Sequence, residues 1–208
     1  MEYLDYYDEN RNFLGSKTRD EVHQEGLWHK TVHCWLYDLD GNVYFQIRKD
    51  SNKFYTTASG HLLKGESVQD AFKREIQEEI GLDIDSSDAL LVDIVEWKMD
   101  KVKKDGSVFK DSAWAHVYLD LFEGDLSSFS FDEEEVLGVV KVNALDTLHL
   151  FETESGEIKG SVIQKEGSQN IEKEMIVSLS DFLVMDHETA LGKYGSVLKK
   201  VIDVVNSN

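Results

Sequence analysis

Three glutamates in this sequence have the spacing to bind a cation from one side of a helix: Glu75, Glu78 and Glu79. A helix is predicted because residues 67–80 contain good helix formers and no internal glycine, with Gly81 where a helix would stop. One apolar stripe of this helix is expected to face the core; it consists of Val68, Phe72, Ile76 and Ile80. The glutamates lie beside that stripe at positions i, i+3 and i+4, where like charges repel and burial is costly.

A cation is needed to compensate these carboxylates. Mg²⁺ and Mn²⁺ take oxygen ligands and turn the repulsion into coordination. Arg74, next to Glu75, is expected to hold one carboxylate in position. The alternative interpretation is an ordinary amphipathic helix with a charged face.

The spacing around this helix resembles the Nudix box. Gly60 is followed by five residues and Glu66, then by seven residues and the run REIQEEIGL at 74–82, without a departure from the family pattern. So many fixed positions make a chance match far less probable than for a short glycine motif. The resemblance implies an α/β/α sandwich with a mixed central sheet. It also implies hydrolysis of a diphosphate linked to another moiety, usually a nucleoside, with Mg²⁺ or Mn²⁺.

The resemblance assigns roles to individual residues of this chain. The catalytic set that it implies comprises Arg74, Glu75 and Glu78. The metal-binding set that it implies comprises Glu66, Glu75, Glu78, Glu79 and the backbone carbonyl of Ser59 or Gly60. In this scheme Glu75 is either a further ligand or the general base, and Arg74 orients it. Glu66 either binds the metal or supports the residues that do.

A later acidic run is a second source of a base or ligand, because many family members take one from a late loop. The candidates are Glu133, Glu134 and Glu135. Glu135 is preferred because Val136 begins an apolar run, and Glu134 is next. A solvated run of charges is the alternative, and the pattern favours it.

A narrower resemblance, over much of residues 2–122, is to the Nudix branch that contains isopentenyl-diphosphate isomerase. It is carried by Trp28-His29, His33, Gln46-Ile47-Arg48 and Ser59-Gly60-His61. In that enzyme a cysteine performs the proton chemistry two residues before a metal-binding histidine, and Ser59 stands where the cysteine would be. Its two later metal-binding glutamates fall near Lys110 and Ser112. A hydroxyl is a much poorer acid than a thiol, so hydrolysis is favoured over isomerisation.

Substrate-binding candidates also follow from the isomerase resemblance. Arg48 and Lys53 match loosely the basic residues that hold its diphosphate, although surface charges would look the same. His61, together with His29 and His33, is expected to line the pocket or touch a metal, the alternative being a hydrogen-bonded structural histidine. A third hypothesis, a non-catalytic nucleotide-binding or regulatory Nudix module, is disfavoured by the complete acidic set.

Length and composition favour a single acidic domain. The chain has 208 residues and a formal net charge of −19, which argues against a nucleic-acid polymer as partner because phosphates need a basic footprint. No apolar run is long enough for a membrane span, and the acidic N-terminus lacks a signal-peptide pattern. A single cysteine, Cys34, excludes an intrachain disulfide and agrees with a reducing compartment. We expect a cytoplasmic protein, and the family makes a homodimer plausible.

The order of predicted elements suits one Nudix domain over residues 1–208. We expect a β-hairpin at 2–22, a core at 28–150 and a C-terminal extension at 152–208. The predicted strands cover 28–37, 43–48, 54–59, 89–98 and 112–122. The stretch 131–142 opens with an acidic cluster and continues as a strand, and a short helix covers 145–151. The extension is expected to begin as a surface excursion with a hairpin around Gly156 or Gly167. A helical pattern then follows between Ser180 as N-cap and Val205, divided at Gly192 and Gly195.

One basic segment contrasts with the acidic chain. Between two predicted strands, five lysines surround an Asp105-Gly106 turn: Lys98, Lys101, Lys103, Lys104 and Lys110. A solvated hairpin tip is the favoured interpretation. A phosphate-attracting lip over the site is the alternative.

Overall fold

The computed structural model describes residues 1–84, 87–102, 106, 108–183 and 190–207. Its α-helices are α1 (Arg19–Glu25), α2 (Val68–Ile80), α3 (Ala144–Thr153) and α5 (Gly195–Asn206), and a π-helix, η3, covers Ala190–Tyr194. Two 3₁₀ turns are η1 (Leu126–Ser128) and η2 (Leu179–Asp181). The strands are β1 (Tyr3–Tyr7), β2 (Phe13–Thr18), β3 (Trp28–Tyr37), β4 (Asn42–Arg48), β5 (Phe54–Tyr55), β6 (Ala58–His61), β7 (Leu90–Val102), β8 (Val108–Leu121), β9 (Val136–Asn143), β10 (Ile158–Glu166) and β11 (Gln169–Val177).

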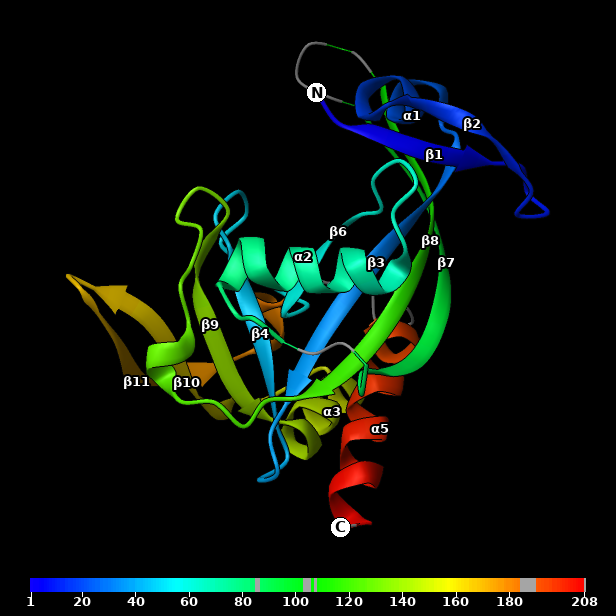
Figure 1. The fold of residues 1–208 in the computed structure, drawn as a ribbon. Helices are drawn as coiled ribbons and strands as arrows, with labels where there is room; N and C mark the ends of the chain where they lie inside the picture. Colours follow the sequence, from blue (N-terminus) through cyan, green and yellow to red (C-terminus); the bar gives the residue numbers. More distant parts are fainter. Residues whose placement is uncertain (85–86, 103–105, 107, 184–189, 208) are drawn as a thin grey trace.

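The strands form one mixed sheet. Its main path runs β11-β10-β9-β4-β3-β1-β2, while β5 joins β4, β6 and β8 join β3, and β7 joins β8. β3 and β8 are parallel over ten residue pairs, and the other pairs between named strands are antiparallel. The parallel pair requires a long crossover, and α2 lies within it (Figure 1).

Helices cover both faces of the sheet. Side chains alternate along each strand, so one strand contributes side chains to the packing on both faces. On β3, Cys34 and Leu36 pack beneath α2 with Phe72. Trp35, between them in sequence, points to the other face and packs with Leu198 of α5. Figure 1 shows α2 across one face and α3 and α5 beyond the opposite one. The predicted α/β/α sandwich with a mixed sheet and a C-terminal helix is confirmed.

The predicted N-terminal hairpin is formed by β1 and β2, which pair antiparallel. α1 follows at once because Thr18 and Glu21 form a capping box: the Glu21 amide donates to Thr18 Oγ1 and the Thr18 amide donates to the Glu21 carboxylate. α1 therefore begins beside the hairpin and brings Arg19 and His23 next to the main sheet.

A single strand over 54–59 was the wrong prediction, since the segment forms two short strands. Thr57 lies between the two strands, and its hydroxyl makes two hydrogen bonds. The Leu36 amide donates to Thr57 Oγ1 at 2.9 Å, and this hydroxyl donates to the Tyr44 carbonyl. β5 consequently pairs with β4 and β6 pairs with β3. The change of partner leads Gly60 under α2.

The segment after α3 is more than a surface excursion. β10 and β11 form a hairpin whose turn contains Gly167, at φ +61°, and β10 pairs with β9 in the main sheet. Ile163 on β10 is fully buried in the core. Of the two glycines predicted for the turn, Gly167 is the correct one; Gly156 lies between α3 and β10.

Ser180 does not cap a helix. It lies inside η2, where Ser178 and Asp181 make the capping contacts, and the chain then extends through Phe182. A tertiary contact keeps the chain extended here: the Leu183 amide donates to the Phe54 carbonyl at 2.7 Å, which holds this segment alongside β5. The helical pattern resumes as η3 and α5, which meet between Tyr194 and Gly195, so Gly195 does mark the division.

β7 and β8 form a longer hairpin than predicted. Of the five lysines of the basic segment, Lys103 and Lys104 lie outside the described residues, as does Asp105. Within the described part of the chain, we find no helix of the length and apolar content that crossing a membrane requires.

Candidate active site

α2 positions the three glutamates of the box. The Asp70 amide donates to Ser67 Oγ at 3.1 Å to cap its first turn, and Gly81, at φ +73°, ends it in the left-handed conformation. The predicted stripe is buried, so the neighbouring carboxylates are drawn toward the sheet. Glu75 and Glu79 are only 8% and 5% exposed, whereas the side chain of Glu78 is 59% exposed at the rim.

Glu79 is held by two donors from the sheet. The Ser59 amide donates to Glu79 Oε2 at 2.9 Å, and Gln46 Nε2 donates to the same oxygen at 3.0 Å. Burial raises the pKa of Glu79 to about 8, a rise that the charges of Glu75 and Glu135 increase. This carboxylate is therefore fixed in place but short of positive charge.

Arg74 holds the carboxylates from one side. Its guanidinium donates to both oxygens of Glu66 at 2.8 and 3.0 Å, to Glu75 Oε1 at 2.7 Å, to Glu78 Oε2 at 3.0 Å and to the His61 carbonyl at 2.9 Å. Glu66 also accepts from the Leu63 amide at 2.8 Å. The structure thus places Glu66 behind Arg74 and places Glu75 and Glu78 on the side of the cavity.

These groups surround a cavity of about 220 Å³. Its lining residues are Glu2, Arg19, Ser59, Gly60, His61, Leu63, Arg74, Glu75, Glu78, Glu79, Asp132 and Glu135. Glu135 was the preferred acid of the later run. Asp132 opens the same run and was missed; its amide donates to the Glu79 carbonyl at 3.0 Å, a contact that only the fold makes. Glu2 was also missed, and it reaches the cavity from the N-terminal hairpin.

The other two acids of the later run point elsewhere. Glu133 pairs with Lys165 at 2.7 Å, and Glu134 lies 3.3 Å from Lys49 with its side chain 89% exposed. Neither lines the cavity. For these two residues the solvated interpretation describes the geometry.

The residues present fit a divalent cation. Burial raises the pKa of Glu75 to about 7, with the charges of Glu78 and Glu135 adding to the rise and Arg74 opposing it. Two buried carboxylates therefore share a cavity with insufficient positive charge, and carboxylate oxygens are the ligands that Mg²⁺ and Mn²⁺ prefer. Glu78 and Glu79 are the residues that would hold the ion, with Glu75 either a further ligand or the general base.

A second, larger cavity of about 560 Å³ adjoins the acidic one. The two cavities share Arg19, Ser59, Gly60, His61, Glu79 and Glu135. Arg48 lines the larger cavity, with its guanidinium paired to Asp50 at 2.8 Å. Lys53 does not line it, because its ammonium group donates to the Ser180 carbonyl. Of the predicted substrate-binding residues, the structure therefore brings Arg48 and His61 to the site and leaves Lys53 outside.

Two of the four tryptophans and one lysine of β7 also line the larger cavity. Trp35 and Trp97 line the larger cavity, while Trp28 and Trp114 stack on each other with ring centroids 4.6 Å apart. Lys101 of β7 also lines the cavity. This strand therefore contributes both stacking surface and positive charge.

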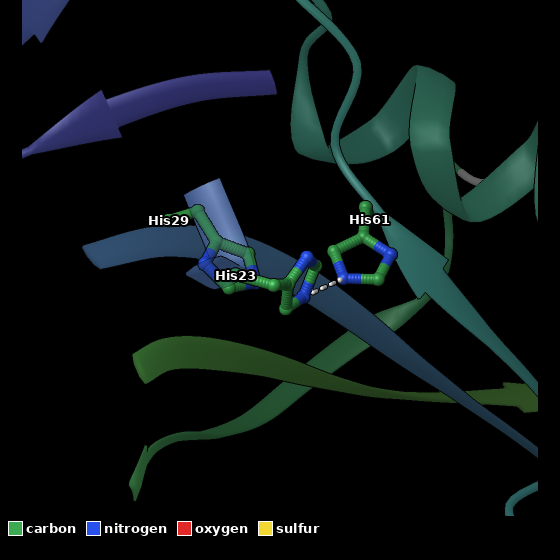
Figure 2. Close-up of side chains that lie close together, drawn as sticks. All are labelled: His23, His29 and His61. Atoms are coloured by element: carbon green, nitrogen blue, oxygen red, sulfur yellow. Dashed lines mark hydrogen bonds between the residues drawn. The ribbon is translucent and has the colours of Figure 1, made fainter. Parts of the chain in front are cut away.

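Three histidines meet beside the acidic cavity: His23 of α1, His29 of β3 and His61 of β6 (Figure 2). One ring nitrogen from each lies within 4.8 Å of the others, and Nε2 of His23 and of His61 are 3.2 Å apart. Nε2 of His29 is buried without a hydrogen-bond partner among the described residues and lies 3.4 Å from Asp111 Oδ1. Burial lowers the pKa of all three rings, that of His61 most. Burial therefore favours the uncharged form of each ring.

Only part of this cluster was predictable from the sequence. His29 and His61 were candidates, but His23 was missed because only the packing of α1 brings it near them. His33, the third candidate, is not part of the cluster but lines the larger cavity, as predicted, and contacts the Tyr55 hydroxyl through Nε2 at 3.3 Å.

Comparison with known proteins places this site in a family. The chain is 28% identical to an uncharacterized Nudix hydrolase of Clostridium acetobutylicum, over 97% of this chain and 98% of that protein. It is also 28% identical to an isopentenyl-diphosphate Delta-isomerase of Serratia proteamaculans, over 59% of this chain and 68% of that enzyme. A crystal structure from Deinococcus radiodurans shares the fold with a TM-score of 0.53 and 18% identity, covering 74% of this chain and 91% of that one.

The sequence model of the NUDIX domain matches residues 27–160, well over half of the chain. This range contains the whole box and the strands β3 and β6 beside it. The chain therefore belongs to the Nudix family.

Proposed function

We propose that this protein hydrolyses a diphosphate linkage in a small nucleotide-like substrate and depends on Mg²⁺ or Mn²⁺. The observation that carries the proposal is the position of Glu75, Glu78 and Glu79 on one cavity that continues into a larger, partly aromatic one. An anionic diphosphate needs compensation by a cation, and a linked group needs the larger space.

The cation, when bound, supplies the charge that neutralises the diphosphate and polarises the phosphoryl oxygens. Arg74 fixes Glu75 Oε1, so the orientation of this carboxylate is set before substrate arrives. With its raised pKa of about 7, Glu75 is suited to take the proton of the attacking water. Water then forms the new P–O bond, the bridging P–O bond breaks, and the leaving phosphate departs with the bonding electrons.

Arg19 and Arg48 contribute charge on the substrate side. Both line the larger cavity, and Arg19 also lines the acidic one. A guanidinium binds phosphate oxygens with parallel hydrogen bonds. In the proposed complex they attract and orient the diphosphate between the two cavities.

The experiment compares Glu78→Gln and Glu79→Gln with the wild type on a panel of diphosphates supplied with Mg²⁺ or Mn²⁺. Each variant should lose hydrolysis while circular dichroism shows the fold retained. Glu134→Gln is the matched control, because this carboxylate belongs to the later acidic run but lies outside the cavity. Unchanged turnover in both box variants would remove the assignment.

The second candidate is isomerisation of a prenyl diphosphate, and the histidine cluster is the observation that favours it. The resemblance to the isomerase branch implies a metal held by the histidine two residues after Ser59, and this residue, His61, belongs to the cluster. Against it, Ser59 offers a hydroxyl where that enzyme has a thiol. Incubation with isopentenyl diphosphate decides: formation of dimethylallyl diphosphate without phosphate release would reverse the order of the two candidates.

A further inference from the structure

The far wall of the larger cavity comes from residues beyond the NUDIX match. The match ends at residue 160, yet Leu183 and Tyr194 line the cavity together with residues of the matched domain. They belong to the C-terminal segment formed by residues 178–183 and η3. The domain alone therefore leaves this side of the cavity open.

The first part of the C-terminal segment is anchored on β5. The Leu183 amide donates to the Phe54 carbonyl at 2.7 Å, and Phe54 and Phe182 form a parallel bridge. The Phe182 ring is buried and lies edge-on against Phe45 and Phe151, with centroids 5.1 and 4.9 Å away. Leu183 itself stays 38% exposed at the cavity.

The second part ends in a buried tyrosine. Tyr194 is the last residue of η3, and its ring lies 5.4 Å from Trp35, 6.0 Å from Phe151 and 6.4 Å from Tyr55. Its hydroxyl donates to the Leu183 carbonyl at 3.3 Å. This hydrogen bond joins the two parts of the segment into one wall, and π-helical turns often occur at functional sites.

The register of β3 gives the direction of the cavity. His33 pairs with Ser59 and Thr31 pairs with His61, so this part of β3 lies at the acidic end. Trp35 is two residues further along the same strand, roughly 7 Å beyond His33. Tyr194 rests on Trp35, so the C-terminal wall lies at the end away from the carboxylates.

The two ends differ in chemistry. The acidic end holds the charged groups of the box and Arg19. The larger cavity adds three charged side chains, Arg48, Lys101 and Asp111. Its apolar and aromatic lining comes from Trp35, Val95, Trp97, Met99, Ala113, Ala115, Val117, Leu183 and Tyr194. Trp97 stands opposite Ala113 in the β7–β8 register, and both residues line the cavity. An indole is a large flat apolar surface of the kind that packs against another ring.

We infer that the C-terminal segment is the specificity element of this enzyme, with Leu183 and Tyr194 limiting the size of a flat, apolar or aromatic group linked to the diphosphate. The inference rests on the proposed diphosphate hydrolysis. The ring of a nucleobase and a simple aryl group share this chemistry.

The test uses methyl, phenyl and 2-naphthyl diphosphate and adenosine diphosphate, each with Mg²⁺. Binding is measured by titration calorimetry, and initial rates on the same compounds give kcat and KM. The wild type should bind the naphthyl or adenosine compound at least about tenfold more tightly than methyl diphosphate. Preference for naphthyl identifies an apolar pocket, and preference for adenosine identifies a nucleobase pocket.

Leu183→Trp fills the far end. It should remove the preference for the larger group by raising its Kd or KM, with little change for methyl diphosphate. Leu137→Trp is the matched control: this leucine is 42% exposed on β9, lies outside the cavity and should leave the preference intact. Leu183→Ala covers the case in which the tryptophan variant does not fold, and it should shift preference toward the naphthyl compound.

The outcomes separate this inference from the proposed function. Tight binding without hydrolysis would contradict the proposed function, while the Leu183 variants would still test the wall through Kd. Equal losses for all compounds in Leu183→Trp, or no binding of any compound by the wild type, would overturn the inference.

Discussion

Gly60 and Glu75 lie so close together that a Cβ atom on Gly60 would fall 1.9 Å from Oε1 and 2.4 Å from Oε2 of Glu75. Gly60 cannot withdraw, because it pairs with Val32 in the sheet. Glu75 is fixed on the other side by Arg74. The glycine that begins the box therefore makes room for the carboxylate that the box presents.

Gly60→Ala should displace the Glu75 carboxylate with little change in the fold. Misplacement of a catalytic group by about 1 Å costs about 10²-fold in rate, so we expect a loss of that order in kcat/KM. Mn²⁺ affinity, measured by titration calorimetry, should fall in parallel. Gly192→Ala is the control, since no atom lies within 4 Å of a Cβ there. Wild-type rate and affinity in Gly60→Ala would contradict the close contact.

Divalent ions should stabilise the wild type and fail to stabilise Glu79→Gln. A ligand at 100 times its Kd raises the free energy of unfolding by about 2.7 kcal/mol, and the buried Glu79 carboxylate is the group that most needs compensation. The measurement is Tm with MnCl₂ and with EDTA. Glu134→Gln, whose carboxylate is exposed, should keep the full shift. An equal Tm shift in Glu79→Gln would place the ion elsewhere.

Features encoded locally were predictable from sequence. α2 was foreseen because its apolar stripe, Ser67 and Gly81 all lie within one segment. The strands β3 and β4 agree with the predicted strands at 28–37 and 43–48, which lie in runs of strand formers. Patterns of this kind need no knowledge of distant residues.

Features that depend on distant contacts were not predictable. His23 joins His61 only through the packing of α1, and the pattern around Ser180 suggested a helix because nothing nearby reveals the contact of Leu183 with Phe54. The position of Lys53 also depends on a distant contact. Its partner is the Ser180 carbonyl, 127 residues away, so sequence spacing could not exclude it from the site.

Arg74→Lys should weaken the site because an ammonium group cannot reproduce the contacts of a planar guanidinium with Glu66, Glu75 and Glu78. In a double-mutant cycle with Glu66→Gln, we expect a coupling energy of about 1–3 kcal/mol from urea unfolding. Hydrolysis should fall in the single variant Arg74→Lys, since Glu75 loses its orientation. Additive effects of the two substitutions on stability would show that the pair is not coupled.

The histidine cluster should make the protein less stable in acid. Burial keeps the pKa of His23, His29 and His61 below the ordinary value, so between pH 7 and 5 the unfolded chain gains protons that the folded chain does not. The free energy of unfolding therefore falls as pH falls, by up to about 2 kcal/mol for each histidine over this range. Glu75 and Glu79 act in the opposite direction, because their raised pKa values favour the folded state at lower pH.

The contribution of one ring is isolated by subtraction. His61→Gln keeps a polar group that does not titrate. The carboxylates contribute to the free energy of unfolding of both proteins, so their effect cancels when the variant's value is subtracted from that of the wild type. Urea unfolding in EDTA at pH 7, 6 and 5 should show a smaller loss of stability for His61→Gln than for the wild type. His149→Gln, at an exposed position of α3, is the control and should follow the wild-type curve. Parallel curves for all three proteins would mean that His61 takes up a proton in the folded state as readily as in the unfolded state.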